Sequence, residues 1–472
     1  MLGVRSRARE AASLGAMKSF RRTPALTLSF AGFLTQLDVT AVIVALPSIG
    51  ADLGFGLAAY AWVMDAYSLA FTATLLASGA LADRFGRRRV LLVGNALFAV
   101  ASLACGLAWD GPTLWAARVA QGFAAAFVIT GSIALTASAY PDPADRARAF
   151  GLAGIISGAA MAIGPTLGGA VAAWFGWRWI FLANIPFCLL AGWIVPRLVA
   201  EERACDARPL DPVGIALLTL ALGIAIETLL AGRTASHIVI GAAASLVFTG
   251  LFVVQQRTRP RPIVDLALLA QPAMIAVALL LITVSVAYWA VLVYLPLFLT
   301  TTFGLSIAQS GVMMLAATLP MIFLPPLAGR LATQWGWRAL FTAGLALIAV
   351  GDVVLALGPA WAMAFVATIL GMVVIATGAA LVQSQLSGAV VTLAPPAQAG
   401  MASALTIVMR QGGFAVGIAA LGAALDATLG GNVAASSFPL VFGLAALAAV
   451  AGAGVAWMLL PRPKHDAVAR CR

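Results

Sequence analysis

The stretch GALADRFGRRRVLL, residues 79–92, places five charged residues within seven positions, whereas the flanking segments 66–82 and 90–109 contain none. One helical crossing of a bilayer needs about 20 apolar residues. The pattern therefore predicts two membrane-spanning helices joined by a short basic loop at the membrane surface. The whole 472-residue chain fits this class, since 62% of its residues are hydrophobic and 10% are charged. We expect an all-α polytopic membrane protein.

Uncharged runs divide the chain into fourteen predicted transmembrane helices. They begin near residues 25, 58, 88, 112, 147, 178, 212, 236, 271, 308, 338, 361, 398 and 435.

The basic residues predict the orientation of these helices. If both termini are cytoplasmic, 24 of the 28 Lys and Arg residues fall in cytoplasmic tails and loops. Arg178 and Arg233 then lie outside, and Arg118 and Arg410 lie within helices. This is the bias that membrane proteins show toward positive cytoplasmic loops. We therefore expect a multi-pass protein of the bacterial inner membrane. Its net charge of +11 is explained by this topology, so we expect no binding of nucleic acid.

A weaker copy of the basic loop occurs 250 residues later, where GRLATQWGWRA (329–339) aligns with GALADRFGRRR (79–89). Two parallel halves related by duplication would produce this repeat. The offset exceeds six helices, so an extra helix pair is predicted between the halves. The expected regions are a tail (1–24), a six-helix bundle (25–200), the inserted pair with its loops (201–268), a second six-helix bundle (269–460) and a tail (461–472).

Three further segments add to the evidence from the basic loop: LDVTAVIVALP (37–47), ARVAQG (117–122) and GAAMAIGPTLGGAVAAWFGWRWIFLANIP (158–186). Together they resemble the major facilitator superfamily, in its fourteen-helix drug:proton antiporter branch. One departure is Ile43, where that branch usually has Asn. The resemblance implies a transporter driven by a proton gradient, without a cofactor.

The resemblance also implies a conformational role for the loop motif, residues Gly79, Asp83, Arg84, Gly86, Arg87 and Arg88. Asp83 is the only acid there, and the uncharged start of helix thirteen offers free N–H groups and a favourable dipole. We expect Asp83 to contact that helix start when the cytoplasmic side is closed; the alternative is that it only balances the arginines. In helix five, Gly154, Gly158, Gly164 and Gly168 share one face with Pro165, which predicts a smooth surface for close helix packing or for a moving contact. The resemblance implies a conformational role for Gly164, Pro165, Gly168 and Gly169 of this helix.

Charges inside the membrane are costly, so each one needs a reason. The sequence places four acids and two arginines there: Asp38, Asp65, Glu227 and Asp352 against Arg118 and Arg410. Asp38 is the first candidate proton carrier, with a carboxylate locked for packing as its alternative. Arg118 is expected to tune it, or else to form a static ion pair.

The remaining acids carry weaker expectations. Asp65 is a second proton-carrying candidate or a solvated rim residue. Glu227 and Asp352 are possible relay residues, and Glu227 alternatively faces the membrane interface near Arg233. The two histidines lie at or beyond helix ends, and the four cysteines have no paired spacing, so no disulfide framework or metal site is indicated.

Aromatic, thioether and polar side chains on helices nine, ten and thirteen predict a largely hydrophobic, adaptable substrate cavity. Its candidate residues are Tyr288, Trp289, Tyr294, Met313, Arg410 and Gln411. The expected function is a proton-coupled exporter of lipophilic drugs or antibiotics, acting as a monomer in the bilayer. The alternative is a proton-coupled symporter for solute uptake. Motifs of intramembrane enzymes and nucleotide-binding proteins are absent, so we expect no enzyme.

Overall fold

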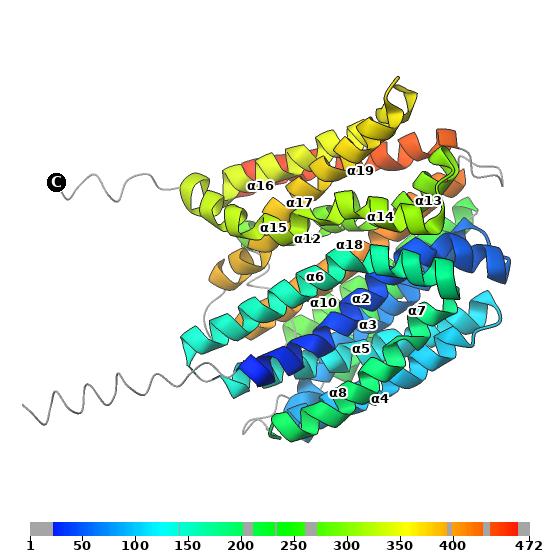
Figure 1. The fold of residues 1–472 in the computed structure, drawn as a ribbon. Coiled ribbons are helices and arrows are strands. Elements are labelled where there is room, and N and C mark those ends of the chain that lie inside the picture. The colour runs from blue at the N-terminus through cyan, green and yellow to red at the C-terminus, as the bar shows by residue number, and fades with distance from the viewer. Residues whose placement is uncertain are drawn as a thin grey trace, which may run out of the picture.

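The computed structural model describes residues 22–140, 142–201, 211–231, 234–259, 271–393, 399–427 and 435–460. Within these ranges the secondary structure is helical, and long helices run side by side in one elongated bundle (Figure 1). The predicted all-α class is therefore confirmed.

The first group of helices supplies six crossings. It comprises α2 (Arg22–Leu53), α3 (Leu57–Phe85), α4 (Arg87–Gly106), α5 (Gly111–Ala139), α6 (Pro143–Phe175) and the interrupted helix α7 (Arg178–Leu182) with α8 (Asn184–Leu198). Two further crossings follow, α9 (Pro212–Ala231) and α10 (Ala235–Thr258).

The last group supplies six more crossings. It comprises α12 (Pro272–Val284), the π-helix η1 (Ser285–Ala290), α13 (Val291–Phe303), α14 (Ile307–Thr318), α15 (Pro320–Phe323), α16 (Pro325–Leu357), the 3-10 turn η2 (Gly358–Ala360), α17 (Ala364–Leu393), α18 (Ala399–Ala427), the 3-10 turn η4 (Ala435–Ser437) and α19 (Phe438–Leu459). We call these two groups the N-terminal and C-terminal halves.

The helix α16 is broken at Gly336, whose φ of 76° lies outside the helical range. Its first part therefore completes the crossing begun by α14, and its second part is a crossing of its own. Counted this way, the described residues form the fourteen predicted crossings. Gly86, 250 positions earlier, also has a positive φ, of 108°, between α3 and α4. Only glycine adopts such angles readily, so both copies of the loop motif turn on a glycine.

The outer surface of the bundle is apolar. Within the described residues, eleven helices are each long and apolar enough to cross a membrane by themselves, and Pro212–Thr228 and Ile307–Phe323 are shorter apolar helices. Large hydrophobic side chains stay exposed along their lengths, including Val100 on α4 (66% exposed), Leu246 on α10 (72%) and Leu447 on α19 (66%). In water such a surface would drive aggregation, whereas in a bilayer it faces lipid.

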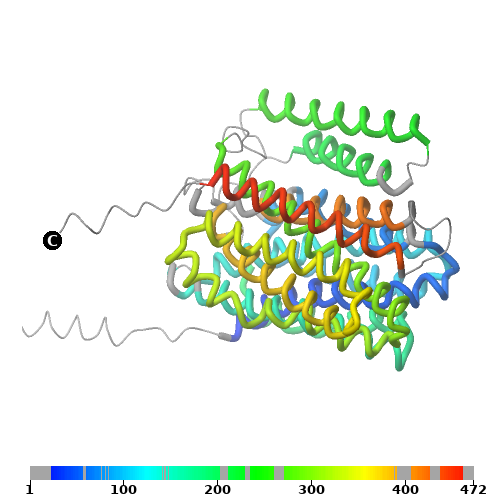
Figure 2. The backbone as a smooth tube through the Cα atoms, turned by 90° about the horizontal axis from the view of Figure 1, so that it is seen from above, coloured from blue at the N-terminus to red at the C-terminus, as the bar shows by residue number. Residues whose placement is uncertain are grey.

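The inserted pair α9–α10 lies at one edge of the bundle (Figure 2). Helix α9 packs against α3 of the N-terminal half and α18 of the C-terminal half. Ile226 is completely buried there, together with Ala415 and Ala419 of α18. The pair therefore covers the seam between the halves along one side.

Candidate transport site

Asp38 and Arg118 form an ion pair inside the N-terminal half. Asp38 lies near the middle of α2 and Arg118 in the first part of α5, and both side chains are 0% exposed. Arg118 Nη1 donates to Asp38 Oδ2 at 2.7 Å. Its Nε donates to the Val63 carbonyl of α3 at 3.0 Å. The guanidinium also lies 4.4 Å from the centroid of the Tyr67 ring, which adds a cation–π contact.

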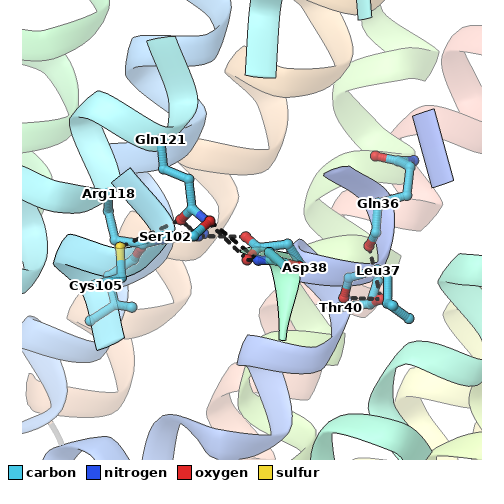
Figure 3. A network of polar contacts seen from close by, with 10 residues as sticks. Gln36, Leu37, Asp38, Thr40, Ser102, Cys105, Arg118 and Gln121 are labelled. Carbon is cyan, nitrogen blue, oxygen red and sulfur yellow. Dashed lines mark hydrogen bonds and ion pairs between the residues drawn. The ribbon is translucent and has the colours of Figure 1, made fainter. Parts of the chain in front are cut away.

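Two amides complete the surroundings of Asp38, and Figure 3 shows that of Gln121. Gln121 Nε2 donates to Asp38 Oδ1 at 3.0 Å, and Asn184 Nδ2 donates to the same oxygen at 2.7 Å. Gln121 also donates to Ser102 Oγ at 2.9 Å and accepts from Arg118 Nη1 at 2.6 Å. The carboxylate thus accepts from three N–H donors. Both carboxylate oxygens therefore have hydrogen-bond donors facing them, Oδ2 from Arg118 and Oδ1 from the two amides.

Sequence reasoning identified Asp38 and Arg118 as partners but missed Ser102, Gln121 and Asn184. A signal for Gln121 was present, because residues three apart on a helix share a face. Asn184 is the first residue of α8, directly after the break that separates it from α7. Its approach to Asp38 depends on how that broken helix packs, which spacing alone does not reveal.

A cavity lies between the two halves, on the other side of α2 from Asp38. Its empty space is about 550 Å³, counting the part that is open to the outside. Its lining comes from α2, α3 and α6 in one half and from η1 and α18 in the other: Gln36, Val39, Thr40, Ile43, Tyr67, Ser68, Met161, Trp289, Arg410, Gln411 and Phe414. At 100° per residue, Asp38 is roughly 200° around α2 from Gln36. Tyr67 is common to both places, since its ring lines the cavity and also contacts Arg118.

Of the six predicted cavity residues, Trp289, Arg410 and Gln411 line this cavity. Tyr288 and Tyr294 are instead buried, and their hydroxyls donate to the carbonyls of Ala317 (2.7 Å) and Ile418 (2.6 Å). Met313 packs against the hydrophobic core, partly buried. Trp289 is placed by the π-helix η1, a local widening that often marks functional positions.

The other acids have different surroundings. Asp65 is completely buried on α3, which corrects the alternative of a solvated rim residue: its position is covered where α3 packs against α5 and α18. Asp352 on α16 is also completely buried, and neither acid has a hydrogen-bond partner among the described residues. Glu227 is half-exposed and contacts His237 Nε2 at 3.1 Å; Arg233 lies outside the described residues.

The glycines of α6 make two kinds of close contact, one with α2 in the same half and one with α14 in the other half. A Cβ on Gly164 or Gly168 would collide with Thr40 or Ala41 of α2, within the same half. A Cβ on Gly169 would lie 2.9 Å from the Ile307 carbonyl and 3.1 Å from Gly311 Cα, across the seam.

Further contacts hold the halves together at this level. The Pro165 carbonyl faces Gly311, and Thr166 Oγ1 donates to the Gly311 carbonyl at 2.9 Å. Toward the start of α6, a Cβ on Gly151, Gly154 or Gly158 would meet nothing within 4 Å. Figure 1 shows α6 diverging from α15 and α16 in that direction. The halves therefore touch at the end away from the basic loop.

The basic loop is held by an acid that the sequence had not indicated. The Glu201 carboxylate accepts from the backbone N–H groups of Arg88 (3.0 Å) and Arg89 (3.1 Å), and so caps the start of α4. Arg88 Nη1 also donates to the Val199 carbonyl at 3.0 Å. A Cβ on Gly86 would lie 2.7 Å from Glu201 Oε1. Gly86 is therefore required twice: its positive φ makes the turn, and its lack of a Cβ leaves room for the Glu201 carboxylate that caps α4.

The remaining loop residues take separate places. Gly79 faces Thr130 on α5, Arg84 lies over the ring of its neighbour Phe85, and Arg87 Nη1 reaches the Ala134 carbonyl at 3.5 Å. The side chain of Asp83, the residues just before α18 and the side chains at the start of α18 lie outside the part of the chain that the structure describes. The contact between Asp83 and the start of α18 stays a prediction.

Comparison with known proteins agrees with this architecture. The family described as Major Facilitator Superfamily matches residues 28–418. The multidrug resistance protein Stp of Mycobacterium tuberculosis is 32% identical over 415 residues, covering 86% of this chain and 77% of that protein. The methylenomycin A resistance protein of Streptomyces coelicolor is 30% identical, covering 93% of both chains.

A solved bacterial homolog of the human lysosomal transporter Spinster, described as inward-facing and occupied, superposes with a TM-score of 0.69 at 15% identity. It covers 94% of this chain and 97% of its own. That likeness shows the fold. With a matching family profile, relatives that are resistance proteins, and fourteen helices around a cavity at the seam of two halves, the chain belongs to the Major Facilitator Superfamily of membrane transporters.

Proposed function

We propose that the protein is a proton-coupled antiporter that exports small lipophilic molecules from the cytoplasm by alternating access. The observation that carries the proposal is the fully buried Asp38–Arg118 pair behind the wall of the cavity. A membrane transporter has no structural need for a buried charge pair, because well-packed apolar residues are commonly as stable or more stable. A carboxylate that gains and loses a proton during the cycle accounts for its presence.

The arrangement supports a defined step of such a cycle. In the orientation predicted from the basic residues, the halves touch at the outer end, so the cavity faces the cytoplasm. Asp38 is paired with Arg118 in this conformation, the arrangement expected after proton release to the cytoplasm and before substrate loading. Protonation of Asp38 from the outside would weaken its attraction to Arg118 and its two amide donors. The halves would then return toward this conformation once substrate has left.

The wall of the cavity supports lipophilic substrates. Tyr67, Trp289 and Phe414 supply aromatic surface, and Val39, Ile43 and Met161 supply aliphatic and thioether surface. Such walls accept varied molecules, because methionine and aromatic side chains adapt to different shapes. The resistance proteins related to this chain carry names of the same kind, since Stp is called a multidrug resistance protein.

A reconstituted transport assay tests the proposal. Purified protein in liposomes would be given an imposed pH gradient, and both substrate accumulation and proton movement would be followed for a panel of lipophilic compounds. We expect substrate and proton to move in opposite directions, and transport to stop when an ionophore collapses the gradient. Movement of substrate and proton in the same direction would instead establish the symporter alternative. Transport that is indifferent to the gradient would refute proton coupling.

A further inference from the structure

The charge of the cavity points to one class of substrate, an inference that rests on the proposed function because it concerns the same site. Among the eleven lining side chains that the structure describes, Arg410 is the only one with a formal charge, and none is an acid. The polar remainder consists of the amides of Gln36 and Gln411 and the hydroxyls of Thr40, Tyr67 and Ser68. A positive charge therefore meets any molecule that enters.

Arg410 has no counter-ion within the described part of the chain. The nearby acid of α2, Asp38, faces away from the cavity and is already paired with Arg118. Ser285 Oγ donates to the backbone carbonyl of Arg410 at 2.9 Å, and among the described residues the guanidinium itself forms no ion pair. A guanidinium in a membrane interior without a partner is costly, so the site is built to receive an anion.

The surrounding donors strengthen this reading. The indole N–H of Trp289 is buried and has no hydrogen-bond partner among the described residues. Gln411 places an amide directly beside Arg410 in the same wall. Guanidinium groups bind carboxylates through two parallel hydrogen bonds, which gives both strength and orientation.

We propose that the transported substrate is a lipophilic carboxylate, whose anionic group pairs with Arg410 while its apolar body lies against Trp289, Phe414 and Ile43. A lipophilic cation is disfavoured, because it would meet the Arg410 charge in a site that offers no acid. The cavity thus selects by charge within the broad class of lipophilic compounds.

Three probes that share one aromatic body test the charge preference: 2-naphthylacetate, 2-naphthylacetamide and 2-(2-naphthyl)ethylammonium. Equilibrium binding of each radiolabelled probe to the full chain in lipid nanodiscs requires no proton gradient. We expect the carboxylate to bind about 10- to 100-fold more tightly than the amide, as a charge-assisted hydrogen bond implies, and the ammonium to bind more weakly than the amide.

Variants assign the preference to one residue. Arg410→Gln should abolish the advantage of the carboxylate over the amide. Arg410→Lys should retain part of it, because lysine keeps the positive charge but cannot form two parallel hydrogen bonds to a carboxylate. Arg338→Gln is the matched control: Arg338 lies in the same half, over the Trp457 ring and outside the cavity. It should leave the preference unchanged.

Equal binding of carboxylate and amide by the wild type would overturn the proposal, as would a carboxylate that fails to bind up to its solubility limit. Undiminished carboxylate binding by folded Arg410→Gln would overturn it as well. The two proposals fail separately. If the carboxylate binds through Arg410 but no pH gradient drives its transport, proton coupling is wrong and the anion site stands. If a pH gradient drives export of the amide and the ammonium as readily as the carboxylate, proton coupling stands and the preference for a carboxylate is wrong.

Discussion

The Asp38 carboxylate lies 2.7 Å from the Arg118 guanidinium, and neither side chain is exposed. The pair lies within the N-terminal half, with the ring of Tyr67 contacting the cation on one side and forming part of the cavity wall on the other. A change in the charge of Asp38 can therefore reach the cavity through a single aromatic side chain.

Replacing Asp38 by Asn should abolish transport driven by a pH gradient, because the amide cannot carry the exchangeable proton. Asp52→Asn is the matched control. Asp52 lies on the same helix, but its partners are Arg178 (2.6 Å) and Trp177 (3.1 Å) at the far end of α2, and its side chain is half-exposed. Uptake into proteoliposomes with an imposed gradient measures both variants. Wild-type coupling in Asp38→Asn would exclude Asp38 as the proton carrier, and Asp65 would become the next candidate.

Replacing Gln121 by Leu should slow transport driven by a pH gradient. Gln121 donates to Asp38 at 3.0 Å and accepts from Arg118 at 2.6 Å, and leucine can do neither, so both charged side chains lose a buried partner. A hydrogen bond to a charged group is worth about 1.5–3 kcal/mol, which corresponds to a roughly 10- to 100-fold effect on the step that depends on it. The initial rate of uptake into proteoliposomes with an imposed gradient measures the loss. A wild-type rate would show that Gln121 does not support the Asp38–Arg118 pair during transport.

Replacing Gly169 by Leu should prevent the halves from closing at the end away from the basic loop. Its Cβ would lie 2.9 Å from the Ile307 carbonyl and 3.1 Å from Gly311 Cα, both backbone atoms that cannot rotate away. Gly154→Leu is the control on the same helix, because a Cβ there meets nothing within 4 Å.

The readout for this pair is a cysteine placed at the cavity residue Met161 in an otherwise cysteine-free chain. A membrane-impermeant thiol reagent should label it from the far end in Gly169→Leu and not in Gly154→Leu. Equal labelling of the two variants would mean that the Gly169–Gly311 contact does not hold this end closed.

Asp211 should stabilise the inserted helix pair by joining the start of α9 to the end of α10. It accepts from the Gly214 N–H (2.9 Å) and from the Gln255 (2.8 Å) and Gln256 (2.9 Å) amides. Arg259 Nη1 lies 3.4 Å away. Burial by itself would raise the pKa of Asp211, but these hydrogen bonds and the nearby arginine outweigh it and lower the pKa.

Asp211→Asn should therefore lower the free energy of unfolding by about 1–2 kcal/mol at neutral pH, the usual cost of losing a helix cap. Because the folded-state pKa is lowered, the wild-type advantage is present above the unfolded-state pKa, about 3.9, and disappears as the pH falls through the folded-state value. Thermal unfolding in detergent at neutral and acidic pH measures both effects. A difference that stays constant down to strongly acidic pH would contradict the assignment.

The two halves differ at the site although they share a fold. The offset of 250 that relates Gly86 to Gly336 also relates Asp38 to Tyr288 and Arg118 to Thr368. All four of these residues are buried, but only Asp38 and Arg118 form an ion pair. The duplicated architecture thus holds a charge pair in its N-terminal half and a tyrosine and threonine in its C-terminal half.

The sequence by itself determined the class, the number of crossings and the place of the basic loop between two of them. These follow from local properties: apolar runs long enough to span a bilayer, and clustered arginines between them. It also singled out Asp38 and Arg118, since a charge in an apolar helix needs a reason wherever its neighbours lie.

Only the tertiary structure decided which side chains meet. Asn184 reaches Asp38 across 146 positions, Glu201 caps α4 from 112 and 113 positions away, and Arg410 joins Gln36 and Trp289 in one wall. Tyr288 and Tyr294 are buried and donate to backbone carbonyls, while Tyr67 turns toward the cavity. An apolar transmembrane helix has no polar face to reveal its orientation, because lipid and protein interior are equally apolar. The rotation of each helix is therefore fixed by packing against its neighbours, and the site follows from that packing.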